Sequence, residues 1–180
     1  VSSHAMTEGR VDGVRFDVAG FTNLSQDHLD YHDTMERYYQ AKAQLFTPAH
    51  TARGIVGIDD DWGRRLAIEA TVPVQRWSTR DGDADWSLVL GGDGMWVVGP
   101  DRTPHALRLR LPGDYNRANA LLAFAMLREA GVAASDAAAG ITGTVVPGRM
   151  EQISGEGDIT GIDDYAHSPD AIARVLAAVR

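Results

Sequence analysis

The residues Asp114-Tyr-Asn-Arg-Ala-Asn-Ala-Leu-Leu-Ala-Phe-Ala-Met-Leu-Arg-Glu-Ala130 carry the clearest helical pattern of this chain. Gly131 follows at once, and glycine is a common residue just past the last turn of a helix. The residues of the expected apolar face recur at helical spacing, namely Ala118, Leu121, Leu122 and Ala125. The pattern predicts a long helix that buries one face.

Strand-like and helical segments alternate on both sides of this helix. Short apolar runs bounded by Gly, Asp or Pro predict strands at Val14–Phe21, Gly54–Ile58, Val72–Trp77, Trp86–Leu90, Met95–Val98 and Ala106–Leu111. Helices are expected from Thr34, as N-cap, to Phe46, from the acidic run 59–61 to about Ala70, and from Ser135 to about Thr142. After Val146-Pro-Gly148 a new strand (Asp158–Asp163) and helix (Ser168–Val179) begin. The order predicts an α/β fold with a domain boundary near residues 154–157.

Composition excludes several classes of function. The chain has 180 residues, 44% of them hydrophobic and 23% charged, which is ordinary for one or two globular domains. A formal net charge of −8 argues against a nucleic-acid or membrane partner, and no apolar run approaches the roughly 18 residues that span a bilayer. The absence of cysteine rules out disulfides and thiolate metal sites.

One lysine stands out among the cations. Lysine and arginine together number 17, and all but Lys42 are arginine. Burial can make a lysine neutral and nucleophilic, whereas arginine stays charged. Just before Lys42 lies the polar stretch Thr22–His32, which packs ligands for metals or protons into six residues: Asp27, His28, Asp30 and His32. We expect the chemistry here. Asp27, Asp30 and His32 also suit a structural role as caps and hydrogen-bond partners of the turn, and we prefer that role for Asp30 and His32.

Five signatures in order resemble one family. They are Val1-Ser-Ser-His-Ala5, Thr22–His32, Ala41-Lys-Ala43, Gly113-Asp-Tyr-Asn-Arg-Ala-Asn119, and Pro147-Gly-Arg-Met-Glu151 together with Asp164-Tyr-Ala-His-Ser-Pro-Asp170. Together they resemble the ATP-dependent Mur ligases, specifically the MurE type, the UDP-N-acetylmuramoyl-tripeptide synthetases. The resemblance implies an α/β fold. Residues 1–154 would form the later part of the central ATPase domain, a mixed sheet with flanking helices. Residues 155–180 would form the first strand and helix of a Rossmann-like C-terminal domain.

The resemblance also implies a catalytic centre at His28 and Lys42. His28 matches a magnesium ligand, and Lys42 matches a lysine that carbon dioxide carbamylates into an anionic oxygen ligand. A neutral imidazole is an unusual partner for a hard cation, so carboxylate help is expected nearby. Carbamylation needs a neutral amine and therefore a lowered lysine pKa.

The nucleotide and substrate residues follow from the same resemblance. Asn116 and Asn119, one helical turn apart, match residues at the adenine edge, although Asn116 also suits a helix-start cap. Arg149, Asp164 and His167 match the phosphate and ribose side. Ser2, Glu8 and Arg10 match residues of the UDP-muramoyl dipeptide site. Ser2 would also suit the N-cap of a helix, and Arg10 would suit a surface cation.

The implied reaction is amide-bond formation driven by ATP with Mg²⁺. The partners would be UDP-N-acetylmuramoyl-L-alanyl-D-glutamate and a diamino acid, with composition favouring meso-diaminopimelate over L-lysine. The resemblance places the enzyme in the cytoplasm as a monomer, without a nucleic-acid or membrane partner. No Gly-x-x-x-x-Gly-Lys-Ser/Thr loop is present, and the family's glutamate ligand would precede Val1, so we expect an incomplete and inactive ligase. Asp163 places a charge where the family's strand is apolar, and we expect it to weaken that strand.

Three other functions remain open. A folylpolyglutamate synthase shares the central-domain plan, but the Ser2-Ser-His4 start and the Asp164 motif weigh against it. A carbamyl-lysine metallohydrolase would use Lys42 with neighbouring His and Asp residues, yet it leaves Asn116 and Asn119 unexplained. A non-catalytic scaffold would need neither nucleotide nor metal. Nucleotide dependence therefore separates three readings: a ligase needs ATP and magnesium, a hydrolase needs metal alone, and a scaffold needs neither.

Overall fold

A computed structural model describes residues 1–91, 94–154, 159–167 and 169–179. Its main sheet has six strands in the order of the chain: β1 (Ala19–Phe21), β2 (Gly54–Gly57), β3 (Val74–Ser78), β4 (Trp86–Gly91), β5 (Gly94–Val98) and β6 (Pro104–Leu107). Strands β1 to β4 pair in parallel, and β4, β5 and β6 pair antiparallel. The α/β class and the mixed sheet expected from the sequence are confirmed.

Seven α-helices are present in the described residues. They are α1 (Ser3–Thr7), α2 (Leu29–His32), α3 (Met35–Ala43), α4 (Asp61–Glu69), α5 (Asp114–Glu129), α6 (Ala134–Gly143) and α7 (Pro169–Ala178), and a 3₁₀ turn at Gln44–Phe46 extends α3. The expected caps form: Thr34 Oγ1 accepts from the backbone N–H of Arg37 at 3.2 Å, and Asp60 Oδ1 accepts from that of Gly63 at 2.6 Å. No helix in this part of the chain is long and apolar enough to cross a membrane.

Strand β2 carries the core on both faces. All of its residues are buried, as a parallel strand covered on both sides requires. Because side chains alternate across a strand, Ile55 joins the cluster around α5, whereas Val56 joins the cluster around α3 and α4. The Leu121 side chain of α5 is fully buried in the first cluster, as its sequence pattern predicts.

Some elements differ from the expected ones. The first strand is shorter, because Val14 is 43% exposed and Phe16 forms only an isolated bridge with Thr51. Strand β7 (Glu151–Ser154), which the sequence reading missed, pairs antiparallel with β8 (Thr160–Asp163). The expected strand start at Asp158, the Ser168 helix start and most of the expected boundary (155–157) lie outside the described residues. The boundary stays a prediction.

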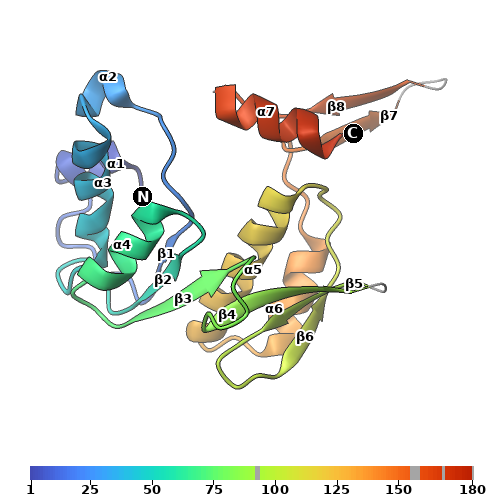
Figure 1. Cartoon of the computed structure of the whole chain (residues 1–180), viewed down its shortest axis with the longest axis horizontal. Helices are drawn as coiled ribbons and strands as arrows, with labels where there is room; N and C mark the ends of the chain where they lie inside the picture. Colours follow the sequence, from blue (N-terminus) through green and yellow to red (C-terminus); the bar gives the residue numbers. More distant parts are fainter. Residues whose placement is uncertain (92–93, 155–158, 168, 180) are drawn as a thin grey trace.

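Strands β7 and β8 with α7 lie together at one end of the molecule, apart from the six-stranded sheet (Figure 1). We call these elements, with their connecting described residues, the C-terminal arm. Asp163 pairs with Glu151 at the end of β8 and is exposed, so its charge meets water and the strand still forms. The arm also exposes apolar side chains, among them Ile153, Ile159, Ile162, Ile172, Leu176 and Val179.

Candidate functional site

A cleft of about 600 Å³ opens at the carboxyl end of strand β1. Thr22 and Asn23, directly after β1, form one wall, and the first half of α5 forms another. The end of α6, the segment leading to β7 and the inner face of α7 close the remaining sides, through Thr144, Arg149 and Val175. Ligands of open α/β sheets bind at this edge, where the parallel strands end.

Asn116 and Asn119 both line this cleft from the first turns of α5. The helix begins after Gly113, whose φ of +98° is a conformation that favours glycine. Asn116 Nδ2 donates a hydrogen bond to the Pro112 carbonyl at 2.6 Å, so the side chain also stabilises the helix start. Asn119 is exposed in the cleft wall. The two amides therefore offer donors and acceptors to one ligand edge.

Arg149 and Asp164 enter the same cleft from the C-terminal arm and the segment before it. Asp164 accepts hydrogen bonds from two backbone N–H groups, that of Met150 at 2.9 Å and that of Ala166 at 2.8 Å. The Arg149 guanidinium lies 4.7 Å from the centre of the Tyr165 ring. Asp164 thereby joins the segment before β7 to the segment after β8, and each carboxylate oxygen keeps a further lone pair.

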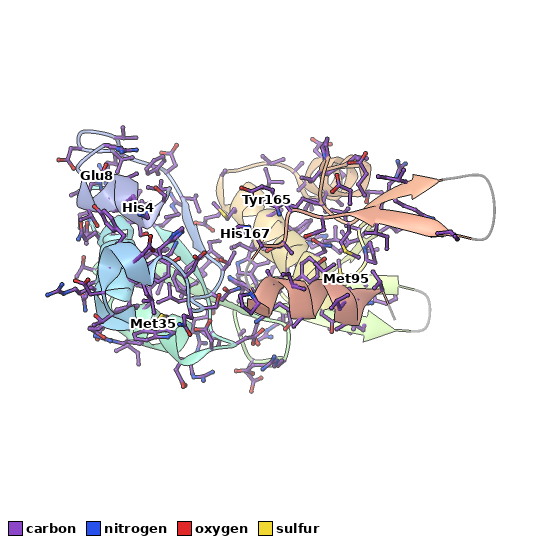
Figure 2. All side chains as sticks on the ribbon, turned by 90° about the horizontal axis from the view of Figure 1, so that it is seen from above. His4, Glu8, Met35, Met95, Tyr165 and His167 are labelled. Atoms are coloured by element: carbon purple, nitrogen blue, oxygen red, sulfur yellow. The ribbon has the colours of Figure 1, made fainter. Side chains whose placement is uncertain are left out.

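His167 is the one expected nucleotide residue that does not line the cleft. Its exposed ring packs against that of Tyr165 at 5.0 Å between centroids, and Nδ1 lies 3.0 Å from the Tyr165 carbonyl oxygen. Figure 2 shows both residues on the segment between β8 and α7.

Lys42 and His28 both lie near the Tyr38 ring in a second cluster. The Lys42 Nζ atom is 5.2 Å from the centre of the Tyr38 ring, and the His28 ring centre is 5.9 Å from the same point. Burial lowers the pKa of Lys42, and the Asp27 carboxylate opposes the shift. The lowered pKa suits an amine that must react in its neutral form.

The metal-ligand role of His28 rests on few donors in this structure. His28 Nε2 is 3.7 Å from Asp27 Oδ2, and His28 has a left-handed backbone with φ of 53°. Within the described residues no three His, Asp or Glu side chains form a ready metal site. Magnesium commonly takes only one or two protein carboxylates and completes its shell with water and substrate phosphates. Asp27 and His28, together with a carbamate if Lys42 carried one, would suit such a partial set.

The three expected substrate residues flank α1, with Ser2 just before the helix and Glu8 and Arg10 after it. Ser2 caps this helix by accepting a hydrogen bond from the Ala5 N–H at 3.1 Å, as its alternative reading proposes. Arg10 pairs with Glu8 at 2.5 Å, and its side chain is still 67% exposed. Tyr31 also donates to Glu8 at 3.4 Å. In Figure 2, His4 and Glu8 lie in the N-terminal part of the molecule, well apart from Tyr165 and His167.

Sequence reasoning missed several residues of both clusters. Arg110, Tyr115 and Arg174 also line the cleft. Tyr115 lies within the Gly113–Asn119 motif, which was a usable signal, and burial raises the pKa of its hydroxyl. The two arginines carry no sequence signal, because only the fold brings their segments to the cleft. Ser3 and His32, described below, are a further pair that the local pattern does not reveal.

Comparisons with known proteins agree with this geometry. The family model described as "Mur ligase middle domain" matches residues 1–127. A UDP-N-acetylmuramoyl-L-alanyl-D-glutamate--2,6-diaminopimelate ligase of Streptomyces coelicolor is 45% identical over 187 residues, covering 100% of this chain and 37% of the relative. A ligase of the same name from Gloeobacter violaceus is 43% identical and is covered over 38% of its length. The chain thus spans little more than a third of these relatives.

Solved structures give the same result. The structure of a UDP-N-acetylmuramoyl-L-alanyl-D-glutamate--2,6-diaminopimelate ligase superposes with a TM-score of 0.81 at 27% identity, over 99% of this chain and 38% of that one. Escherichia coli FolC in complex with DHPP and ADP superposes with a TM-score of 0.70 at 26% identity, over 89% of this chain and 37% of that one. The family match covers well over half of the chain, in the part that holds the lysine cluster and the α5 wall of the cleft. The chain belongs to the Mur ligase family.

Proposed function

We propose that this chain is the lysine-bearing and nucleotide-binding part of a ligase that joins a diamino acid to UDP-N-acetylmuramoyl-L-alanyl-D-glutamate. The observation that carries the proposal is that most of the expected nucleotide residues meet in one place. Asn116, Asn119, Arg149 and Asp164 come from separate parts of the sequence and line one cleft. The names of the relatives favour 2,6-diaminopimelate as the added residue.

In the proposed reaction, ATP phosphorylates the D-glutamate side-chain carboxylate, and ADP leaves. The amine of the diamino acid then attacks the acyl phosphate, forms the amide and releases phosphate. Asn116 and Asn119 would bind the adenine edge, Asp164 the ribose hydroxyls and Arg149 a phosphate. Helix α5 would bind one end of the nucleotide and the C-terminal arm the other. The bound nucleotide would therefore hold α5 and the C-terminal arm together. His167, which packs against Tyr165 and does not line the cleft, would have a weaker role.

The lysine cluster would supply the anionic part of the reaction centre. A carbamate on Lys42, with Asp27 and His28, would hold Mg²⁺ together with substrate oxygens. When bound, this ion supplies charge neutralisation for the transferring phosphoryl group. Ser2, Glu8 and Arg10 would contact the UDP-muramoyl dipeptide from the two ends of α1, with Arg10 suited to a carboxylate or phosphate.

We also propose the division into residues 1–154, as part of the central domain, and 155–180, as the start of a C-terminal domain. The whole enzyme would work as a cytoplasmic monomer without a nucleic-acid or membrane partner. The net charge of −8 supports the part of this proposal that concerns nucleic acid, because a negatively charged protein repels the phosphate backbone.

Substrate dependence tests the proposal in a full-length protein that carries this chain. We expect amide product only when ATP, Mg²⁺, the UDP-muramoyl dipeptide and diaminopimelate are all present, measured by chromatography and mass spectrometry. Extension of a folate in place of the dipeptide would favour the folylpolyglutamate synthase reading. Hydrolysis with metal alone would favour the metallohydrolase.

The cleft is tested separately by calorimetric titration of ADP. Asn119→Leu removes amide hydrogen bonds, so we expect ADP to bind about tenfold more weakly. Gln40→Leu is the matched control, because Gln40 bonds Glu36 on α3 and does not line the cleft. Equal affinity in the two variants would remove Asn119 from the nucleotide site.

A further inference from the structure

The hydroxyl of Ser3 and the imidazole of His32 form a buried hydrogen bond between α1 and α2. Ser3 Oγ and His32 Nε2 are 2.8 Å apart across a separation of 29 residues. Ser3 is 1% exposed and His32 is 5% exposed. Among the described residues this is the only hydrogen bond between two side chains that are both buried. Two apolar side chains would fill the same space without the cost of burying polar atoms.

The contact continues from His32 to the lysine. The His32 ring stacks on the Tyr38 ring with centroids 5.2 Å apart and planes 18° apart. Tyr38 is 7% exposed, and its ring centre lies 5.2 Å from Lys42 Nζ, one helical turn further along α3. We call Ser3, His32, Tyr38 and Lys42 the Ser3–Lys42 chain. It runs from α1 through α2 to the one lysine of the sequence.

We propose that Ser3 and His32 are positioning residues, which hold the Tyr38 ring and thereby fix the amine of Lys42. A lysine side chain has four rotatable bonds, so an amine that must stay in one place needs a rigid neighbour. A directional hydrogen bond holds the imidazole in one orientation, which apolar packing would not specify. The stacked imidazole in turn limits rotation of Tyr38.

The same contacts connect α1 with the lysine. Ser2 faces outward as the cap of α1, whereas the next residue, Ser3, faces inward to His32. His4 extends this connection, since its ring lies 5.0 Å from that of His28 and 5.5 Å from that of His32. A substrate group that contacts α1 would therefore affect the position of the Lys42 amine. This last step rests on the proposed function, whereas the positioning of Lys42 does not.

The positioning is tested by the rate at which Lys42 reacts with trinitrobenzenesulfonate, read by peptide mass spectrometry. The sequence has one lysine, so the peptide that contains it reports on this side chain alone. We expect Ser3→Ala and His32→Phe each to raise the rate about three- to tenfold, the factor that corresponds to one net hydrogen bond. The double variant should react no faster than the faster single variant, because both act through one contact. Ser3→Thr keeps the hydroxyl and should stay within about twofold of the starting chain.

Ser78→Ala is the matched control. Ser78 is also a fully buried serine, but it lies at the end of β3, and its hydroxyl donates to Asp59 and not to a residue of the Ser3–Lys42 chain. An unchanged Lys42 rate in Ser3→Ala, with the same loss of thermal stability as in Ser78→Ala, would overturn the proposal. If Ser3→Ala does not fold, the comparison uses His32→Phe, which keeps an aromatic ring but removes the hydrogen bond.

A second readout separates this proposal from the proposed function. Carbon-13 NMR of the chain in labelled bicarbonate measures the carbamate on Lys42, and we expect its occupancy to fall in Ser3→Ala and His32→Phe. If the unaltered chain shows no carbamate while the labelling rates still respond, the carbamate role fails and the positioning role stands. If carbamate forms equally in all variants and the labelling rates do not change, the positioning role fails.

Discussion

At the scale of single residues, Lys42 shows how the neighbourhood of a side chain changes its chemistry. Its amine is partly buried beside Tyr38, and burial lowers its pKa below the usual 10.5. The fraction of neutral amine at physiological pH therefore rises, which favours reaction with carbon dioxide. Arginine at this position would keep its charge at any working pH.

Replacement of Lys42 by Ala should lower ligation in the full-length protein by at least about a hundredfold, the cost of losing a charge contact in a transition state. Short carboxylates such as acetate should restore part of the rate by supplying the missing anionic oxygens. Lys42→Arg is the control that keeps a cation but cannot be carbamylated, and it should be equally inactive. Normal turnover by Lys42→Ala would refute the role of this lysine.

Glu36 gives a prediction on pH dependence. It accepts two hydrogen bonds from Arg65, and these lower its pKa from 4.5 to about 2. A carboxyl with a depressed folded-state pKa stabilises the fold above its unfolded pKa, and this contribution is lost as the pH falls toward the folded value. Glu36→Gln should therefore be less stable than the starting chain near neutral pH. The difference in unfolding free energy should shrink between pH 4.5 and about 2. Urea unfolding at several pH values measures it, and a constant difference would contradict the prediction.

The sequence alone identifies residues whose role depends on a local motif. Lys42, Asn116 and Asn119 belong to such motifs, and the structure brings the two asparagines into one cleft. His32 was read as a structural residue of the turn, and its partner Ser3 comes from 29 residues away. Contacts of that separation depend on how helices pack, which a local pattern does not contain.

At the scale of elements, helix α4 packs on strand β2 so closely that one position tolerates only glycine. A Cβ atom at Gly63 would lie 1.7 Å from the Gly57 carbonyl oxygen. The backbone of β2 would have to move for any larger residue, because no flexible side chain is there to yield.

Gly63→Ala should therefore lower the free energy of unfolding by about 3 kcal/mol, at the upper end for an overpacked core. Gly140→Ala in α6 is the matched control. A Cβ there meets nothing within 4 Å, and alanine is the better helix former by up to about 1 kcal/mol. Denaturant unfolding of both variants should show opposite signs. A stable Gly63→Ala would mean that α4 and β2 are further apart than described.

Helices and strands were predictable where a local sequence pattern determines them, and not where a contact distant in the sequence does. The caps at Thr34 and Asp60 were predictable because a cap acts within three residues. Strand β7 was not, since only its pairing with β8 makes it a strand and its own residues are exposed where described. Strand β1 was predicted too long, because the alternation of Val14 and Phe16 resembles a strand although Val14 faces water.

At the scale of the whole molecule, the C-terminal arm differs from the rest in burial. On α7 and directly after it, Ile172, Leu176 and Val179 are each at least 45% exposed, at the spacing of one helix face. Helix α5 instead has Leu121, Phe124 and Ala125 fully buried. Local opening costs less free energy where few apolar groups are buried.

Amide hydrogen exchange in the described parts of the arm, β8 and α7, should therefore be much faster than in the middle of α5. Mass spectrometry of the exchanging chain measures both segments in one experiment. Strand β2 serves as an internal reference, because it is buried throughout and should be protected like α5. Equal protection of α7 and α5 would show that the arm is as firmly packed as the main sheet.

The order of the strands in the main sheet repeats their order along the chain. During synthesis on the ribosome, each new strand can therefore add to an edge that already exists, and none has to insert between two earlier strands. Helix α5 contributes a large part of the core on one face, and it is translated after all six strands. A nascent chain would thus hold a growing sheet with one face uncovered until α5 has left the ribosome. That uncovered face is the surface on which chaperones would be expected to act.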